Sequence, residues 1–142
     1  MDRTQTELAM IYLLVKVVHI SSVMTFVGGL LALSVGIRVQ SLPLQRALGR
    51  WDRNVTSPAL GLVWATGIAM VVLGHWFGDV WLTIKFLLVT ALSALHGILS
   101  GKLRRIEHDG TGAVPPAWAG KTGLPIIAAI AAIVALVVFK HV

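Results

Sequence analysis

The chain has no cysteine among its 142 residues. This absence excludes disulfides, thiolate metal sites, iron–sulfur clusters and thiol catalysis. Charge is also scarce, because only 13% of the residues are charged while 56% are hydrophobic, and the mean hydropathy is +0.84. A soluble domain of this length rarely has so few charges. The composition therefore predicts an integral membrane protein in which residues 1–142 form a single transmembrane domain.

Four apolar stretches are long enough to cross a bilayer as helices, which takes roughly 20 residues each. They cover residues 8–37, 55–74, 81–100 and 124–139. We therefore expect an all-α fold, an integral membrane four-helix bundle. The first stretch is long enough to tilt or to project beyond the bilayer.

Basic residues are concentrated in two of the three expected connections, near residues 38–54 and 101–123. In a four-span bundle these two connections lie on the same side. The positive-inside rule places that side in the cytoplasm, so both termini are expected on the periplasmic side of the cell inner membrane. We attribute the excess of 12 Lys and Arg over six Asp and Glu to these connections, and expect no nucleic-acid partner.

Four ionisable side chains lie within the apolar stretches, where a charged group costs about 2.5–3.5 kcal/mol at the bilayer centre. Lys16 and His19 are three positions apart, which places them on one face of a helix. Lys85 and His96 are eleven positions apart, and this spacing also returns them to nearly one face. Because the first and third spans run in the same direction, each presents a lysine toward the outside and a histidine deeper in the bilayer.

This arrangement predicts one compound site. Neutral imidazoles suit a haem iron, and outer cations suit the haem propionates. A copper or zinc site fits less well, because no carboxylate is expected at the depth of the two histidines. Purely structural alternatives stay open: a lysine near the end of a span can snorkel to the interface, and a histidine can bond within the bundle.

The four stretches resemble, in order, the spans of the HemJ-type protoporphyrinogen IX oxidases, which belong to a broader group that includes CopD-like domains. The resemblance covers most of residues 11–140 and is carried by YLLVKVVHISSVMTFVGGLL, TSPALGLVWATGIAM, VWLTIKFLLVTALSALHGILSGKLRR and LPIIAAIAAIVALVVFK. Its most specific parts are K-x-x-H in the first span and W-L-x-x-K followed by H-G in the third.

This resemblance implies a membrane protein that binds haem b, oxidises protoporphyrinogen IX and passes the electrons to a quinone or another respiratory-chain acceptor. It implies His19 and Lys85 as catalytic residues, with His19 as haem ligand and His96 as a second iron ligand. It also implies that four basic residues bind the cofactor through its carboxylates, namely Lys16, Lys85, Arg50 and Arg53.

The chain departs from the family after the first span. The family tends to show a Leu-Pro-Arg run leading to an aromatic-x-His, whereas LALSVGIRVQSLP has no His and no Arg before Arg38. The family's Ser-Trp in the first span appears here as Thr25-Phe26. Two alternatives therefore stay open. One is a non-catalytic haem-binding subunit or electron-transfer anchor of a larger membrane complex, and the other is a CopD-like copper-handling protein.

A G-x-x-x-G pattern, Gly97 and Gly101, lies at the end of the third span. Small residues at this spacing let helix backbones approach closely, either within the bundle or between two copies of the chain. A homo-oligomer is therefore a further expectation.

Overall fold

The structure is a computed structural model that describes residues 3–39, 41–74, 80–109 and Ala128. Nearly all of these residues are helical, and no strand occurs among them. The helices are α1 (Arg3–Gly36), α2 (Leu42–Trp51), the π-helix η1 (Asp52–Thr56), α3 (Ser57–Gly74) and α4 (Val80–Asp109). The expected all-α fold is confirmed for this part of the chain.

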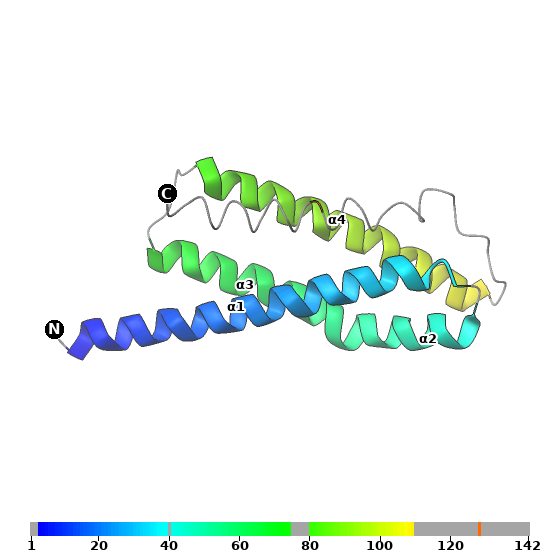
Figure 1. Ribbon diagram of the computed structural model, residues 1–142, viewed down its shortest axis with the longest axis horizontal. Coiled ribbons are helices and arrows are strands. Elements are labelled where there is room, and N and C mark those ends of the chain that lie inside the picture. The colour runs from blue at the N-terminus through cyan, green and yellow to red at the C-terminus, as the bar shows by residue number, and fades with distance from the viewer. Residues whose placement is uncertain (1–2, 40, 75–79, 110–127, 129–142) are drawn as a thin grey trace.

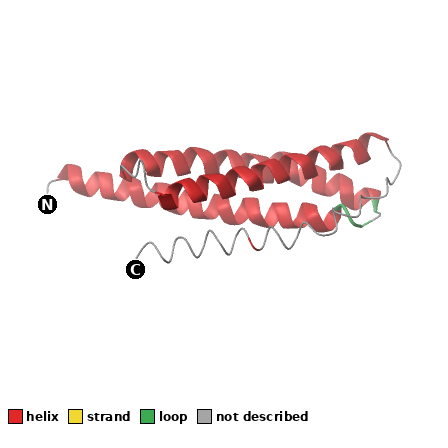
Figure 2. Ribbon diagram, turned by 90° about the horizontal axis from the view of Figure 1, so that it is seen from above, coloured by secondary structure: helices red, strands yellow, loops and turns green. Residues whose placement is uncertain are grey.

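The helices lie along one common axis. α2, η1 and α3 follow one another without a break and run antiparallel to α1, and α4 then returns parallel to α1 (Figure 1). The view from above shows the same alignment (Figure 2). Within the described residues, three helices are long and apolar enough to cross a membrane, namely Arg3–Gly36, Leu42–Gly74 and Val80–Asp109. The expected fourth span, residues 124–139, lies outside the described residues except for Ala128.

The second long helix begins at Leu42, whereas the sequence placed the start of the second span at residue 55. Pro43 lies in the first turn of α2, where its missing N–H breaks no helical hydrogen bond. Gln45 and Gly49 are buried, while Arg46 and other neighbours are exposed. The arginines of this region therefore form one face of an amphipathic helix. The sequence had placed them in a connection between spans, because basic residues are concentrated there.

The helix α4 likewise continues beyond residue 100, the expected end of the third span, to Asp109. Leu103 and Ile106 are buried in this extension, at the three-residue spacing that keeps one helix face against its neighbours. The extension packs against α2. The basic residues between these buried positions therefore belong to the outer face of a helix.

Burial is greater in one half of the bundle, the packed half (residues 26–39, 41–56 and 92–109), than in the other, the open half (residues 3–25, 57–74 and 80–91), of which Ala59 and Val63 still belong to the core. In the packed half, Leu30 and Leu99 are 0% exposed. In the open half, Leu14 is 67% exposed and Leu87 is 65% exposed. The main hydrophobic core consists of Phe26, Leu30, Leu33, Ile37, Ala59, Val63, Leu92, Leu99 and Leu103.

One close approach between α1 and the second long helix is at Gly29. A Cβ atom at this position would collide with the side chain of Thr56, which is fully buried. The absence of a side chain at Gly29 therefore allows α1 to lie against η1.

We expect Gly29→Ala to lower the stability of the protein by about 1–3 kcal/mol, because the added methyl group overpacks the contact with Thr56. Gly28→Ala is the matched control, since a Cβ at Gly28 meets nothing within 4 Å. The control is expected to be as stable as the parent or slightly more so, because alanine favours the helix. Thermal unfolding of the two variants in detergent, followed by circular dichroism, measures the difference, and equal melting temperatures would contradict the close contact.

Candidate functional site

A cavity of about 130 Å³ lies in the open half of the bundle. It is walled mainly by α3 and α4, and α1 contributes one lining residue, His19. Because α4 packs against α2 but has few contacts with α3, large side chains span the space between α3 and α4. The Trp64 and Phe86 rings meet there with their centroids 5.7 Å apart, and Trp81 also lines the cavity.

His19 is held in this cavity by a hydrogen bond to α3. Its Nδ1 lies 2.8 Å from the Thr66 hydroxyl, and that hydroxyl donates its only hydrogen to the Leu62 carbonyl at 2.5 Å. The hydroxyl must therefore accept from the ring, which places the hydrogen of the neutral imidazole on Nδ1. The Nε2 atom then has a free lone pair, as a histidine that binds a metal requires.

Lys85 lines the same cavity from α4. Its Nζ lies 4.3 Å from the centre of the Trp81 ring, a distance at which the cation and the face of the ring attract one another. The structure thus brings His19 and Lys85 together, although they come from different helices. Lys16 is exposed on α1 and does not line the cavity.

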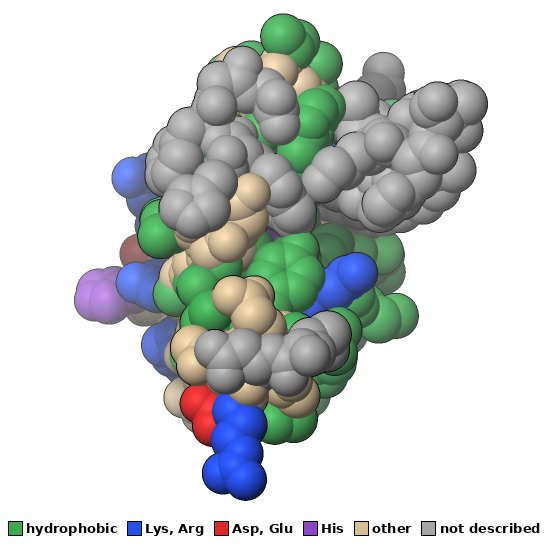
Figure 3. Space-filling view, turned by 90° about the vertical axis from the view of Figure 1, so that its left-hand side faces the viewer, with side chains coloured by type: hydrophobic (Ala, Val, Ile, Leu, Met, Phe, Trp, Pro, Cys, Tyr) green, Lys and Arg blue, Asp and Glu red, His purple; other side chains and the backbone are tan. Residues whose placement is uncertain are grey.

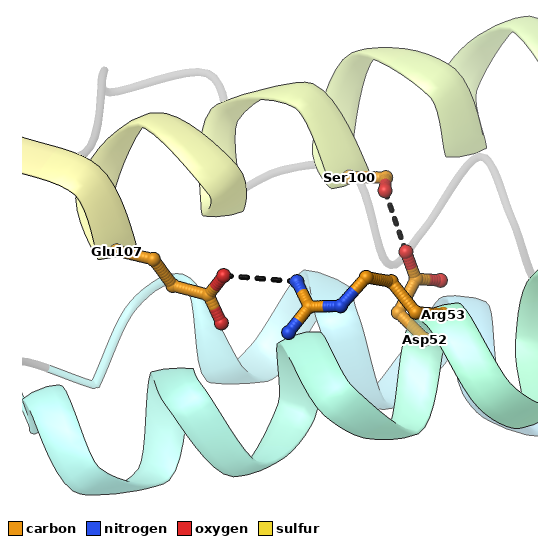
Figure 4. A network of polar contacts seen from close by, with 4 residues as sticks. All are labelled: Asp52, Arg53, Ser100 and Glu107. Atoms are coloured by element: carbon orange, nitrogen blue, oxygen red, sulfur yellow. Dashed lines mark hydrogen bonds and ion pairs between the residues drawn. The ribbon is translucent and has the colours of Figure 1, made fainter.

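His96 lies elsewhere, in a buried polar cluster with Asp52 and Ser100. The His96 Nε2 is 2.7 Å from Asp52 Oδ1, and the Ser100 hydroxyl donates to Asp52 Oδ2 at 2.5 Å, as Figure 4 shows. The side chains of His96 and Asp52 are only 8% and 2% exposed. The edge of the contact is closed by Phe26, whose ring packs against that of His96 with centroids 5.6 Å apart.

The Asp52 carboxylate lies at the level of His96 and corrects, for that histidine, the expectation that no carboxylate lies at its depth. Asp52 belongs to η1, where both Asp52 and Thr56 are buried while Arg53 and Asn54 between them are exposed. The wider turn of a π-helix shifts the register of the side chains, and such turns are frequent at functional sites. The four-residue spacing from Asp52 to Thr56 indicates one helix face that could be buried. The neighbouring arginines instead favoured the interpretation of this region as a solvated connection.

Arg50 and Arg53 lie in the packed half, so neither lines the cavity. Arg53 forms an ion pair with Glu107 of α4 at 3.0 Å (Figure 4), and Arg50 is exposed. These arginines share this end of the bundle with Arg38, Arg46, Lys102, Arg104 and Arg105. The view onto the opposite end, where α1 begins, shows hydrophobic side chains with separate patches of Lys and Arg (Figure 3).

The two histidines are therefore not brought to one site. The ring of His96 packs on Phe26, which is seven residues beyond His19 on α1, or about 10 Å along the helix axis. Among the described residues, no three His, Cys, Asp or Glu side chains gather as they would around a metal ion. The ionisable groups among the described residues that line the cavity are the His19 imidazole and the Lys85 ammonium group.

Comparison with known proteins does not identify a family for this chain. No family model matches the chain, and neither a curated protein nor a solved structure matches it. The resemblance to HemJ-type oxidases therefore stays a prediction that depends on the residues quoted above.

Proposed function

We propose that this chain is an integral membrane protein that binds haem b through His19 and acts as an oxidoreductase of the protoporphyrinogen IX oxidase type. The observation that supports the proposal most is the cavity in the open half. It combines an imidazole with a free Nε2 lone pair, a lysine and aromatic walls. An ionisable pair inside an apolar bundle marks a functional site by default, because its burial is costly.

The proposal places three described helices and residues 124–139 across the cell inner membrane. The exposed apolar side chains of the open half, such as Leu14 and Leu87, suit contact with lipid, because about two thirds of each is uncovered. The arginine-rich packed half then lies at the cytoplasmic side, and both termini lie on the periplasmic side. α1 has 34 residues and is about 51 Å long, so it extends past a hydrocarbon layer of about 30 Å.

The residues of the cavity would supply one ligand to the iron and one partner for a carboxylate of a haem. His19 would hold the iron through Nε2, and Lys85 would hold a propionate through its ammonium group. His96 does not line the cavity and is bonded to Asp52, so the proposal does not use it as a second ligand. A cavity of about 130 Å³ is smaller than the roughly 300–1,000 Å³ of pockets that hold drug-sized ligands. Binding therefore requires the Trp64 and Phe86 side chains to move apart.

Thr66 and Lys85 would have separate tasks in the proposed haem site. Haem b, when bound, supplies a centre that takes up and passes on single electrons. Thr66 fixes the tautomer and the orientation of the His19 ring through its hydrogen bond. Lys85 attracts carboxylates of the cofactor or of the porphyrinogen, and this attraction is strong because the surrounding side chains are apolar.

A second candidate is a haem-binding subunit or electron-transfer anchor without oxidase activity. One observation favours it: the described residues of the segment that departs from the family, 31–39 and 41–43, lie in the packed half, so their departure leaves the haem site of the cavity unchanged. Residue 31 is 12 positions beyond His19 on α1, or about 18 Å along the axis. The described part of the segment therefore does not contribute residues to the cavity. The copper-handling alternative gains no support from the described residues.

Substitution of the two histidines separates the proposed site from the buried cluster. We expect His19→Ala to abolish haem binding, because the variant loses the iron ligand, while His96→Gln retains it. Lys85→Met is expected to weaken haem retention about ten- to hundredfold, the equivalent of a lost hydrogen bond to a charged group. The ratio of Soret absorbance to protein in each purified variant measures occupancy. Full occupancy in His19→Ala would refute the site.

The oxidase reaction is tested with protoporphyrinogen IX under anaerobic conditions, in membranes that contain the protein and a quinone acceptor. We expect fluorescent protoporphyrin to form and to depend on both the protein and the quinone. A haem-loaded protein that forms no fluorescent product would exclude the oxidase and leave the electron-transfer anchor.

A further inference from the structure

The cluster of Asp52, His96 and Ser100 has no part in the proposed haem site, although its residue types are costly to bury. Its geometry is not that of a hydrolase triad, because the carboxylate is the central member. Both the imidazole and the hydroxyl are bonded to Asp52, so Ser100 has no base on its oxygen. The arrangement instead suits the binding and release of a proton, which chains of buried Asp and His perform in membrane proteins.

On its inner side, the cluster is connected to the arginine-rich end of the bundle. Arg104 lies one helical turn beyond Ser100 on α4, is exposed, and interacts electrostatically with Asp52. The neighbouring Arg53–Glu107 ion pair bridges η1 and α4 one turn further out (Figure 4). Among the described residues, the ionisable side chains that act on Asp52 are therefore His96 and Arg104, and the Arg53–Glu107 pair lies next to them. They form a short polar path from the buried carboxylate to the surface.

On its outer side, the cluster is continued along α4 toward the cavity. Ser93 lies three residues before His96, on the same side of the helix. The Trp64 indole donates to the Ser93 hydroxyl at 3.2 Å, and Trp64 itself lines the cavity. The α1 residue that packs against His96 is Phe26, which has no titratable group. Ser93 and His96 are thus neighbouring polar positions on α4 between the cavity and Asp52, although the Ser93 hydroxyl itself donates to the Val89 carbonyl.

We propose that the Asp52–His96 pair carries protons between the arginine-rich face of the bundle and the cavity in its open half. His96 takes up a proton on Nδ1 and releases the one on Nε2 to Asp52, and a turn of the ring then brings the remaining N–H back toward Asp52 for the next transfer. Asp52 then passes a proton to water at the basic face, so that no other reactant is consumed. The proposal uses only groups of the chain and holds with or without haem. It also gives a route for the protons that oxidation of a porphyrinogen in the cavity would release.

Proton flux into vesicles tests the proposal. The full-length protein, with and without haem, is reconstituted into liposomes that contain a pH-sensitive dye, and a potassium gradient with valinomycin drives protons inward. We expect flux above that of empty vesicles, and its loss in both Asp52→Asn and His96→Gln. The matched control is Ser34→Ala, which removes a buried hydroxyl that is bonded only to its own helix, and should retain the flux. Asp52→Glu keeps a carboxylate and should restore part of it.

A chemical modification tests the same proposal in the unsubstituted protein, so the result does not depend on how well the variants fold. Dicyclohexylcarbodiimide adds to carboxyl groups that become protonated in apolar surroundings. In the unsubstituted protein it should attach at Asp52, as located by mass spectrometry, and stop the flux. A flux equal to that of empty vesicles, a flux unchanged in Asp52→Asn, or an Asp52 that stays unmodified would each overturn the proposal. A normal Soret band in the same sample would show that only the proton path, and not the haem site, has failed.

Discussion

The arrangement of the bundle depends on the buried carboxylate of Asp52, which requires hydrogen-bond partners from a neighbouring helix. Asp52 is withdrawn from water, and an unpaired carboxylate at such a position would cost several kcal/mol. Its bonds to His96 and Ser100 fix α4 against η1. Phe26 then packs on His96, and Gly29 lets α1 approach Thr56. All three long helices therefore meet at the level of η1.

This meeting point explains why one half of the bundle is packed and the other is open. From η1 toward α2, the helices share a core of leucine and isoleucine side chains. In the other direction α4 has few contacts with α3, and the cavity with His19 and Lys85 lies between them. Under the proposed function, the packed half holds the helices in place while the open half admits a large planar ligand between aromatic side chains. The proton path would join the two halves.

The sequence predicted the helical class and half of the candidate site. Long apolar stretches were sufficient for the helices, and the cost of burying charge singled out His19 and Lys85, which the structure places in one cavity. Helical spacing gave the faces of Lys16 and His96 but not their neighbours, because neighbours depend on how far one helix is shifted along another. Asp52 was missed because an acid among arginines resembles a solvated connection. A π-helix has no distinct sequence pattern, so its inward turn was not predictable.

The claim that the open half forms a haem site is tested most directly by the visible absorption spectrum of the unsubstituted protein, purified from membranes without added pigment. The account predicts a Soret band whose intensity corresponds to haem b in the preparation and whose position shifts when dithionite reduces the iron. A preparation that is folded by circular dichroism but shows neither a Soret band nor extractable haem would contradict the account.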